Sequence, residues 1–272
     1  MPEPVTYAYA VARPHRDLAQ VLTGLRGVAN APVHLIAEDE DDIVLVVSAV
    51  PAADFREDGL KRHFEDLDWL ESVARAHHSV VEEVASLTGV LPLRLATVYL
   101  DDTRAREVLR SEGRVFAERL DHIAGQVEWG VKIYVEESVH TASVPPESPQ
   151  EPGLTPGRAY LGSRRRQRSD REAAYRAAQE AADRVRDTAR AFATDRVGHR
   201  PQQGVLAEAA GENVVNDAYL VPRDRGDAFR AEAAGASRGL TGVRVEVTGP
   251  WAPYSFAMPG EGADDTAGGV AP

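Results

Sequence analysis

The chain has 272 residues, of which 43% are hydrophobic, and a formal net charge of −12 at pH 7. This composition is enough for one large or two modest folded domains and excludes a disordered chain. The acidic balance argues against nucleic acid or an anionic membrane as the main partner. Because the chain has no cysteine, disulfides, zinc–thiolate sites and cysteine nucleophiles are excluded, and a reducing cytoplasm is the natural setting.

The sequence also indicates where the protein works. The N-terminus lacks the basic stretch and apolar stretch of a signal peptide. The most apolar run, residues 43–47, is far shorter than the roughly 18 residues that a membrane-spanning helix needs. We therefore expect a soluble, intracellular protein.

The first half of the chain predicts six elements from apolar periodicity and turn residues. They are a strand at 5–12, a helix at 17–26, strands at 33–37 and 43–49, a helix at 60–87 and a strand at 91–99. A further helix at 103–124, which begins at the capping residues Asp101, Asp102 and Thr103, leads into the second half.

The second half predicts the same order of elements. They are a strand at 126–135, a helix at 158–195, strands at 205–209 and 213–221, a helix at 225–234 and a strand at 239–248 that stops at Gly249-Pro250. Residues 136–156 hold five prolines and form a loop or linker. Residues 259–272 are rich in glycine, alanine and aspartate, which is typical of a disordered tail.

Each half of the chain has the predicted order β-α-β-β-α-β, which is the arrangement of ferredoxin-like folds. The predicted fold class is α+β, with two domains, each a ferredoxin-like or modified ferredoxin-like sheet with helices on one face. We place an N-terminal α+β domain at 1–124 and a C-terminal ferredoxin-like domain at 125–258, which carries the proline-rich insert 136–156 and is followed by the tail. The halves share no convincing sequence repeat, so the duplication is inferred from architecture alone.

Few residue groups suggest chemistry. His78 and Glu82 lie four apart on a predicted helix and could share a metal ion, but no third ligand is evident, and His77 falls on the apolar face of that helix. Arg94 lies opposite the leucines of its strand, where it can pair with a carboxylate or bind an anion. No dinucleotide, P-loop or serine-hydrolase motif occurs.

Two segments suggest contacts with other molecules. The basic run Arg164–Arg168 is either the solvated start of a helix or a docking patch for an acidic protein surface or a lipid. The segment Trp251–Phe256 places three aromatic residues in a stiff, proline-rich stretch. Such a segment is either a lid on its own domain or a contact for a partner, with Trp251, Tyr254 and Phe256 as the contacting side chains.

Six segments, in order, resemble the gas vesicle proteins of the GvpL/GvpF family over residues 5–257. They are Trp69-Leu70 with Ala76-His77 and Val80, Leu91-Pro-Leu-Arg94 with Thr97-Val98, Glu128-Trp-Gly-Val-Lys132, Gly157-Arg-Ala-Tyr-Leu161, Asn216-Asp-Ala-Tyr-Leu-Val221, and Thr248-Gly-Pro-Trp-Ala-Pro-Tyr-Ser-Phe256. The chain departs from the family at Ala96, where a glycine is common, and in the insert 136–156.

The resemblance implies a non-catalytic accessory role in building gas vesicles, without a cofactor or metal. The implied partners are the major gas vesicle shell protein and other gas vesicle accessory proteins, and the implied location is the gas vesicle in the cytoplasm. Our hypothesis is that an exposed sheet edge or groove receives the shell subunit, with Trp251, Tyr254, Phe256 and Arg94 as candidate contacts. The alternatives are an enzyme that depends on a metal or binds a small anion, and a ligand-sensing module.

Overall fold

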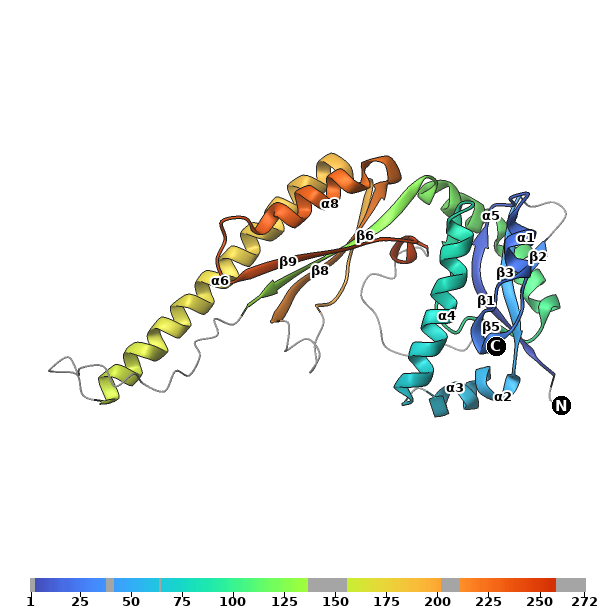
Figure 1. The fold of residues 1–272 in the computed structure, drawn as a ribbon, viewed down its shortest axis with the longest axis horizontal. Helices are drawn as coiled ribbons and strands as arrows, with labels where there is room; N and C mark the ends of the chain where they lie inside the picture. Colours follow the sequence, from blue (N-terminus) through green and yellow to red (C-terminus); the bar gives the residue numbers. More distant parts are fainter. Residues whose placement is uncertain (1–2, 38–41, 64, 137–155, 202–210, 258–272) are drawn as a thin grey trace. The chain divides into compact units, whose positions relative to one another are not determined.

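A computed structural model describes residues 3–37, 42–63, 65–136, 156–201 and 211–257 (Figure 1). Within the long helix α6, the side chains of residues 156–161, 163 and 166 are not described. The chain forms two compact units. Unit 1 comprises residues 1–128 and 250–272, and unit 2 comprises residues 129–249. Residues 250–258 therefore belong with the N-terminal unit, whereas the sequence suggested the C-terminal domain.

Unit 1 contains an antiparallel sheet flanked by helices. Its elements are β1 Val5–Ala12, α1 Leu18–Thr23, η1 Val28–Asn30, β2 Val33–Ala37, β3 Val44–Val50, α2 Ala52–Phe55, α3 Glu57–His63, α4 Leu67–Ala85, β4 Val90–Pro92, β5 Val98–Tyr99, α5 Asp102–Ile123 and η4 Tyr254–Phe256. The strand order is β2-β3-β1-β4, with β5 also paired to β1. This is the order of a ferredoxin-like sheet.

Helices cover both faces of this sheet. Successive residues of β1 point to opposite faces, and their hydrogen bonds identify the helix on each side. Thr6 donates to Asp102 of α5 at 2.6 Å, whereas the hydroxyl of Tyr7 lies 3.0 Å from Nδ1 of His77 on α4. Every residue of β1 is buried as a result. The sequence led us to expect helices on one face of the sheet. The helix α4 covers one face, and α5 covers the opposite face as well.

The helix predicted at 60–87 is interrupted. It forms α3 and α4, and Asp66 between them has extended backbone geometry. The Asp66 carboxylate accepts a hydrogen bond from the Trp69 backbone N–H at 3.1 Å, which makes it the N-cap of α4. Asp101 caps α5 in the same way through the Arg104 N–H at 2.8 Å. The sequence predicted the second cap but missed the first.

The strand predicted at 91–99 is also interrupted, and Ala96 explains why. Ala96 has a φ of 62°, a left-handed conformation that no strand accommodates. The turn closes through the carbonyl of Arg94, which accepts from the backbone N–H and the hydroxyl of Thr97. The Ala96 N–H then donates to the Tyr7 hydroxyl at 3.1 Å. The left-handed geometry also accounts for the glycine that the GvpL/GvpF resemblance led us to expect here.

Unit 2 contains a four-stranded sheet in the order β7-β8-β6-β9, the same relative order as in unit 1. Its elements are β6 Gln126–Val135, α6 Pro156–Phe192, β7 Asp195–Gly198, β8 Glu212–Pro222, η2 Arg223–Arg225, α8 Gly226–Ala234, η3 Gly235–Ser237 and β9 Val243–Trp251. The first residues of β6 and the last residues of β9 belong to unit 1. The prediction of two α+β units with ferredoxin-like strand order is confirmed.

Two strands of unit 2 differ from the prediction. The strand β7 was not predicted, and the predicted strand at 205–209 lies outside the described residues. The closing strand β9 was expected to stop at Gly249-Pro250 but continues to Trp251. Since β9 is at the end of the strand order, an edge strand tolerates the missing N–H of Pro250.

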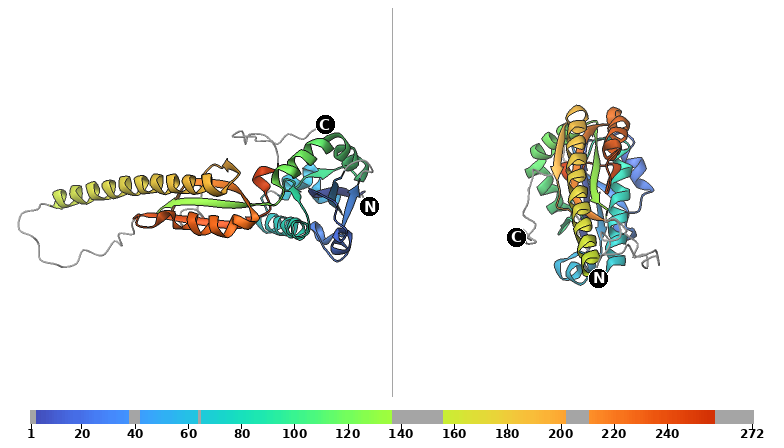
Figure 2. Two further views of the ribbon diagram at one scale, coloured as in Figure 1. Left: turned by 90° about the horizontal axis from the view of Figure 1, so that it is seen from above. Right: turned by 90° about the vertical axis from the view of Figure 1, so that its left-hand side faces the viewer.

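The buried face of the long helix α6 in unit 2 consists mostly of small side chains. From residue 174 onward its buried positions are Ala174, Ala178, Ala181, Ala182, Val185 and Ala189. Phe229 of α8 is fully buried and packs on the ring of Tyr219 from β8, with 5.5 Å between ring centroids. Figures 1 and 2 show α6 running beside α8 and then extending well past it.

Candidate functional site

The aromatic segment near the C-terminus packs on unit 1, and we call residues 250–257 the C-terminal strap. Ala252 joins the hydrophobic core of unit 1, and Tyr254 packs against it. Phe256 is only 4% exposed, and Ala257 is also buried. The strap is therefore a lid on its own unit, one of the two readings that the sequence left open.

The strap meets α4 at its two histidines. The ring of Trp251 lies edge-on to His78 at 5.5 Å between centroids. Tyr254 contacts the rings of both His77 and His78 at 6.2 Å. Trp251 is 41% exposed, whereas Tyr254 is half-buried and Phe256 is buried, so Trp251 is the aromatic residue of the strap with the most surface available to another molecule.

A hydrogen-bonded carboxylate fixes the strap. Glu128 is 8% exposed, and its two carboxylate oxygens accept from the backbone N–H and the hydroxyl of Ser255 at 2.8 and 2.7 Å. Hydrogen bonds to an ionised carboxylate are stronger than neutral ones. This clamp joins residues 127 positions apart, and the sequence offered no signal for it.

His77 is a buried core residue and a poor metal ligand. The Ala96 N–H donates to the Tyr7 hydroxyl, which in turn donates to Nδ1 of His77 when the neutral imidazole carries its proton on Nε2. Burial, helped by the nearby His78, lowers the His77 pKa from 6.5 to about 4, although the backbone of Leu93 opposes the shift. Within the described part of the chain, no group meets hydrogen-bond geometry at its Nε2.

Arg94 lies in a turn that a chain of contacts joins to the strap. Its side chain is exposed on the turn between β4 and β5. The Ala96 N–H of this turn bonds to Tyr7, Tyr7 bonds to His77, and His77 contacts Tyr254. Of the four predicted contact residues, Trp251 and Arg94 present exposed surface, Tyr254 is half-buried and Phe256 is enclosed.

The metal site considered from the sequence lacks a third ligand among the described residues. His78 Nε2 lies 3.1 Å from a carboxylate oxygen of Glu82, so the two residues do form a pair. Among the described residues, however, no group of three or more histidine, aspartate or glutamate side chains converges on a point that could hold a metal ion. The pair is an ordinary (i, i+4) interaction on a helix.

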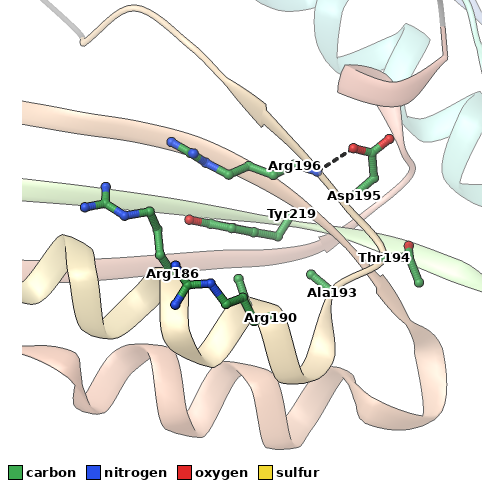
Figure 3. Close-up of a pocket in the computed structure, with 8 residues that line it drawn as sticks. Arg186, Arg190, Ala193, Thr194, Asp195, Arg196 and Tyr219 are labelled. Carbon is green, nitrogen blue, oxygen red and sulfur yellow. Dashed lines mark hydrogen bonds between the residues drawn. The ribbon is translucent and has the colours of Figure 1, made fainter.

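A cavity of about 280 Å³ in unit 2 is lined by three arginines (Figure 3). Each arginine already has a carboxylate partner: Arg186 pairs with Asp183, Arg190 with Asp187 and Arg196 with the buried Asp217 at 2.9 Å. Tyr219 also donates to Asp217 at 3.1 Å, and burial raises the pKa of this tyrosine. Because the guanidinium charges are compensated locally, this cavity is a weak candidate for binding an anion.

This chain has two units with ferredoxin-like strand order, and its fold is similar to that of two solved proteins. It is similar to the gas vesicle protein GvpF of Anabaena sp. PCC7120, with a TM-score of 0.65 and 17% identity over 97% of this chain and 100% of that one. It is similar also to GvpF of Microcystis aeruginosa, with a TM-score of 0.62 and 19% identity over 94% and 99% of the two chains. At these identities the likeness shows the fold.

Sequence comparison establishes the family. The model of the gas vesicle synthesis protein GvpL/GvpF family matches residues 5–258. Gas vesicle protein L of Streptomyces sp. (strain CB03234) is 41% identical over 92% of each chain. Gas vesicle protein F of the same strain is 29% identical over 92% of this chain and 98% of that one. The chain belongs to the GvpL/GvpF family of gas vesicle proteins, as the sequence motifs indicated.

Proposed function

We propose that this protein is a non-catalytic accessory factor of gas vesicle assembly that binds the major gas vesicle shell protein. Family membership supports a role in gas vesicles, and the identity to a protein L exceeds that to the protein F of the same strain. We therefore favour an L-like role, in contact with the shell protein and with other accessory proteins, at the vesicle in the cytoplasm. No described helix has the length and apolarity to cross a membrane.

The observation that carries the binding proposal is the exposure of Trp251 on a fixed support. The Glu128–Ser255 clamp and the buried Phe256 hold the strap, and α4 supports the indole ring through His78. A rigid, half-exposed tryptophan supplies a large contact area and loses little entropy on binding. Such residues often dominate the binding energy of protein interfaces.

The test measures binding to the purified major shell protein. We expect Trp251→Ala to raise the dissociation constant about tenfold or more, since buried interface tryptophans are worth about 2 kcal/mol or more. The matched control is Leu100→Ala, which removes an exposed apolar side chain elsewhere in unit 1 and should change binding by less than about threefold.

The two parts of the proposal fail separately. If the unmodified protein does not bind the shell protein, the proposed function is wrong. If it binds and Trp251→Ala leaves the affinity unchanged, only the contact surface is wrong. If cells that carry Trp251→Ala in place of the original gene form normal vesicles, the strap is likewise not part of the interface.

A further inference from the structure

The N-terminal half of α6, residues 156–173, forms a helical arm, which we call the arginine arm. All side chains described from Arg164 to Ala173 are exposed, and burial of α6 begins only at Ala174. Figure 2 shows this half of α6 extending past the sheet and α8 of its own unit. At 1.5 Å per residue, the arm is about 27 Å long.

The arm has the opposite charge to the rest of the chain. Its sequence contains six arginines and two acidic residues, which gives a net charge of +4. The whole chain carries −12, so the remaining residues carry −16. Because a solvated helix needs no such segregation of charge, the concentration of arginine here calls for a physical role.

Unit 2 supports the arm as a helix at its base. Tyr175 and Arg171 both contact Glu212 of β8, the latter at 3.2 Å. One turn further out, Arg168 pairs with Glu172 at 3.1 Å in the (i, i+4) arrangement that stabilises helices. The packed half of α6 supplies the costly helix nucleus, which the arm extends. The backbone of the arm is therefore helical before any partner arrives.

We propose that the arginine arm is a docking surface for an acidic polypeptide, separate from the strap and independent of the proposed shell-protein contact. Planar guanidinium groups match carboxylates in paired hydrogen bonds, and a row of them on a helix suits a segment rich in glutamate or aspartate. The arm keeps a net charge of +4, whereas each arginine that lines the cavity of unit 2 has an aspartate partner.

Other anionic partners fit the arm less well. A helix that binds a lipid surface needs an apolar face to insert, and the apolar residues of the arm lie near its two ends, with none between Arg164 and Glu172. Single-stranded nucleic acid is bound best where aromatic side chains interleave the basic residues, and none lies between Arg164 and Arg171.

The experiment measures binding of a fluorescent 20-residue polyglutamate peptide to the full-length protein by anisotropy, at 50 and 300 mM salt. We expect salt-sensitive binding, and a dissociation constant that rises at least tenfold in the triple variant Arg164→Gln, Arg165→Gln, Arg168→Gln. The triple lysine variant at these positions, which keeps the charge, should stay within about fivefold. Glutamine has nearly the helix propensity of arginine, so circular dichroism should show unchanged helix content.

The matched control is the triple variant Arg104→Gln, Arg110→Gln, Arg114→Gln, which removes three exposed arginines from α5 in unit 1. It should bind the peptide within about twofold of the unmodified protein. Equal losses in both glutamine variants, or no binding by the unmodified protein, would overturn the proposal. It is overturned too if duplex DNA or phosphatidylserine vesicles bind more tightly than the peptide and depend on the arm.

Discussion

Units 1 and 2 have the same strand order but bury their sheets with different chemistry. In unit 1 the core contains tyrosine, phenylalanine and histidine rings around Tyr7, which contacts Tyr9, Phe55 and His77 within 6 Å between centroids. In unit 2 the long helix α6 contributes mostly alanine to its buried face. The large rings need polar partners for their hydroxyl and imidazole groups, whereas alanine needs none.

This difference teaches where each unit can present a binding surface. In unit 1 the strap completes the aromatic core and leaves Trp251 exposed as its outer part. In unit 2 the alanine face lets α6 lie close to its neighbours, and the arginines occupy the other faces of the same helix. A shared topology therefore supports an aromatic surface in one unit and a charged surface in the other.

The largest expected effect tests whether the strap belongs to the core of unit 1. We expect Phe256→Ala to lower the stability of unit 1 by about 3–5 kcal/mol, the usual cost of removing a buried phenyl ring. Urea unfolding in a Trp129→Phe background would follow unit 1 through Trp69 and Trp251. Trp251→Ala, which alters a half-exposed ring, should cost less than half as much. Equal costs would mean that the strap packs loosely.

The next effect concerns pH and the buried His77. Its pKa is about 4 in the folded protein and 6.5 as an ordinary value. Between these values the unfolded state binds a proton that the folded state does not, so stability falls as pH falls from about 6.5 to 4. The full contribution is at most about 3 to 4 kcal/mol, because one pKa unit corresponds to about 1.4 kcal/mol. We expect His77→Gln to flatten this part of the stability profile for unit 1; an unchanged slope would contradict the buried, neutral imidazole.

A substitution in α6 tests the alanine face of unit 2. Ala181 is fully buried, so Ala181→Leu should force the helix away from its neighbours and cost about 1–3 kcal/mol in unit 2. Ala173→Leu places the same side chain at an exposed position of the same helix and should change stability by less than about 0.5 kcal/mol. Thermal unfolding followed through Trp129 separates the two. If Ala181→Leu is neutral, the close approach of α6 is wrong.

The smallest expected effect concerns the arginine arm itself. Arg168→Gln removes an exposed (i, i+4) ion pair with Glu172 and should lower stability by at most about 0.5 kcal/mol. Urea unfolding at 50 mM salt is the measurement, because salt screens the pair further. A loss above about 1 kcal/mol would show that the arm packs on something and is not a displayed surface.

The sequence by itself determined most of the elements and the order in which they occur. Apolar periodicity marked β6 and α5, and residue composition marked β1 and α6, because each of these signals is local to its own element. The order of elements then pointed to two ferredoxin-like sheets, and the motifs pointed to the family. The order of elements and the motifs can both be read from the linear sequence. The order also limits the topology, because consecutive elements are joined by short connections.

Tertiary contacts decided the breaks and the site. Ala96 takes a left-handed conformation within a turn that bonds to Tyr7, 89 positions away. Periodicity alone therefore predicted one continuous strand at this place. The sequence marked three aromatic residues near the C-terminus without showing which of them face inward. The structure buries Phe256 and exposes Trp251 because Glu128, from a distant strand, accepts both hydrogen bonds of Ser255 and so fixes the strap. Such long-range pairings depend on the folded arrangement and leave no periodic trace in the sequence.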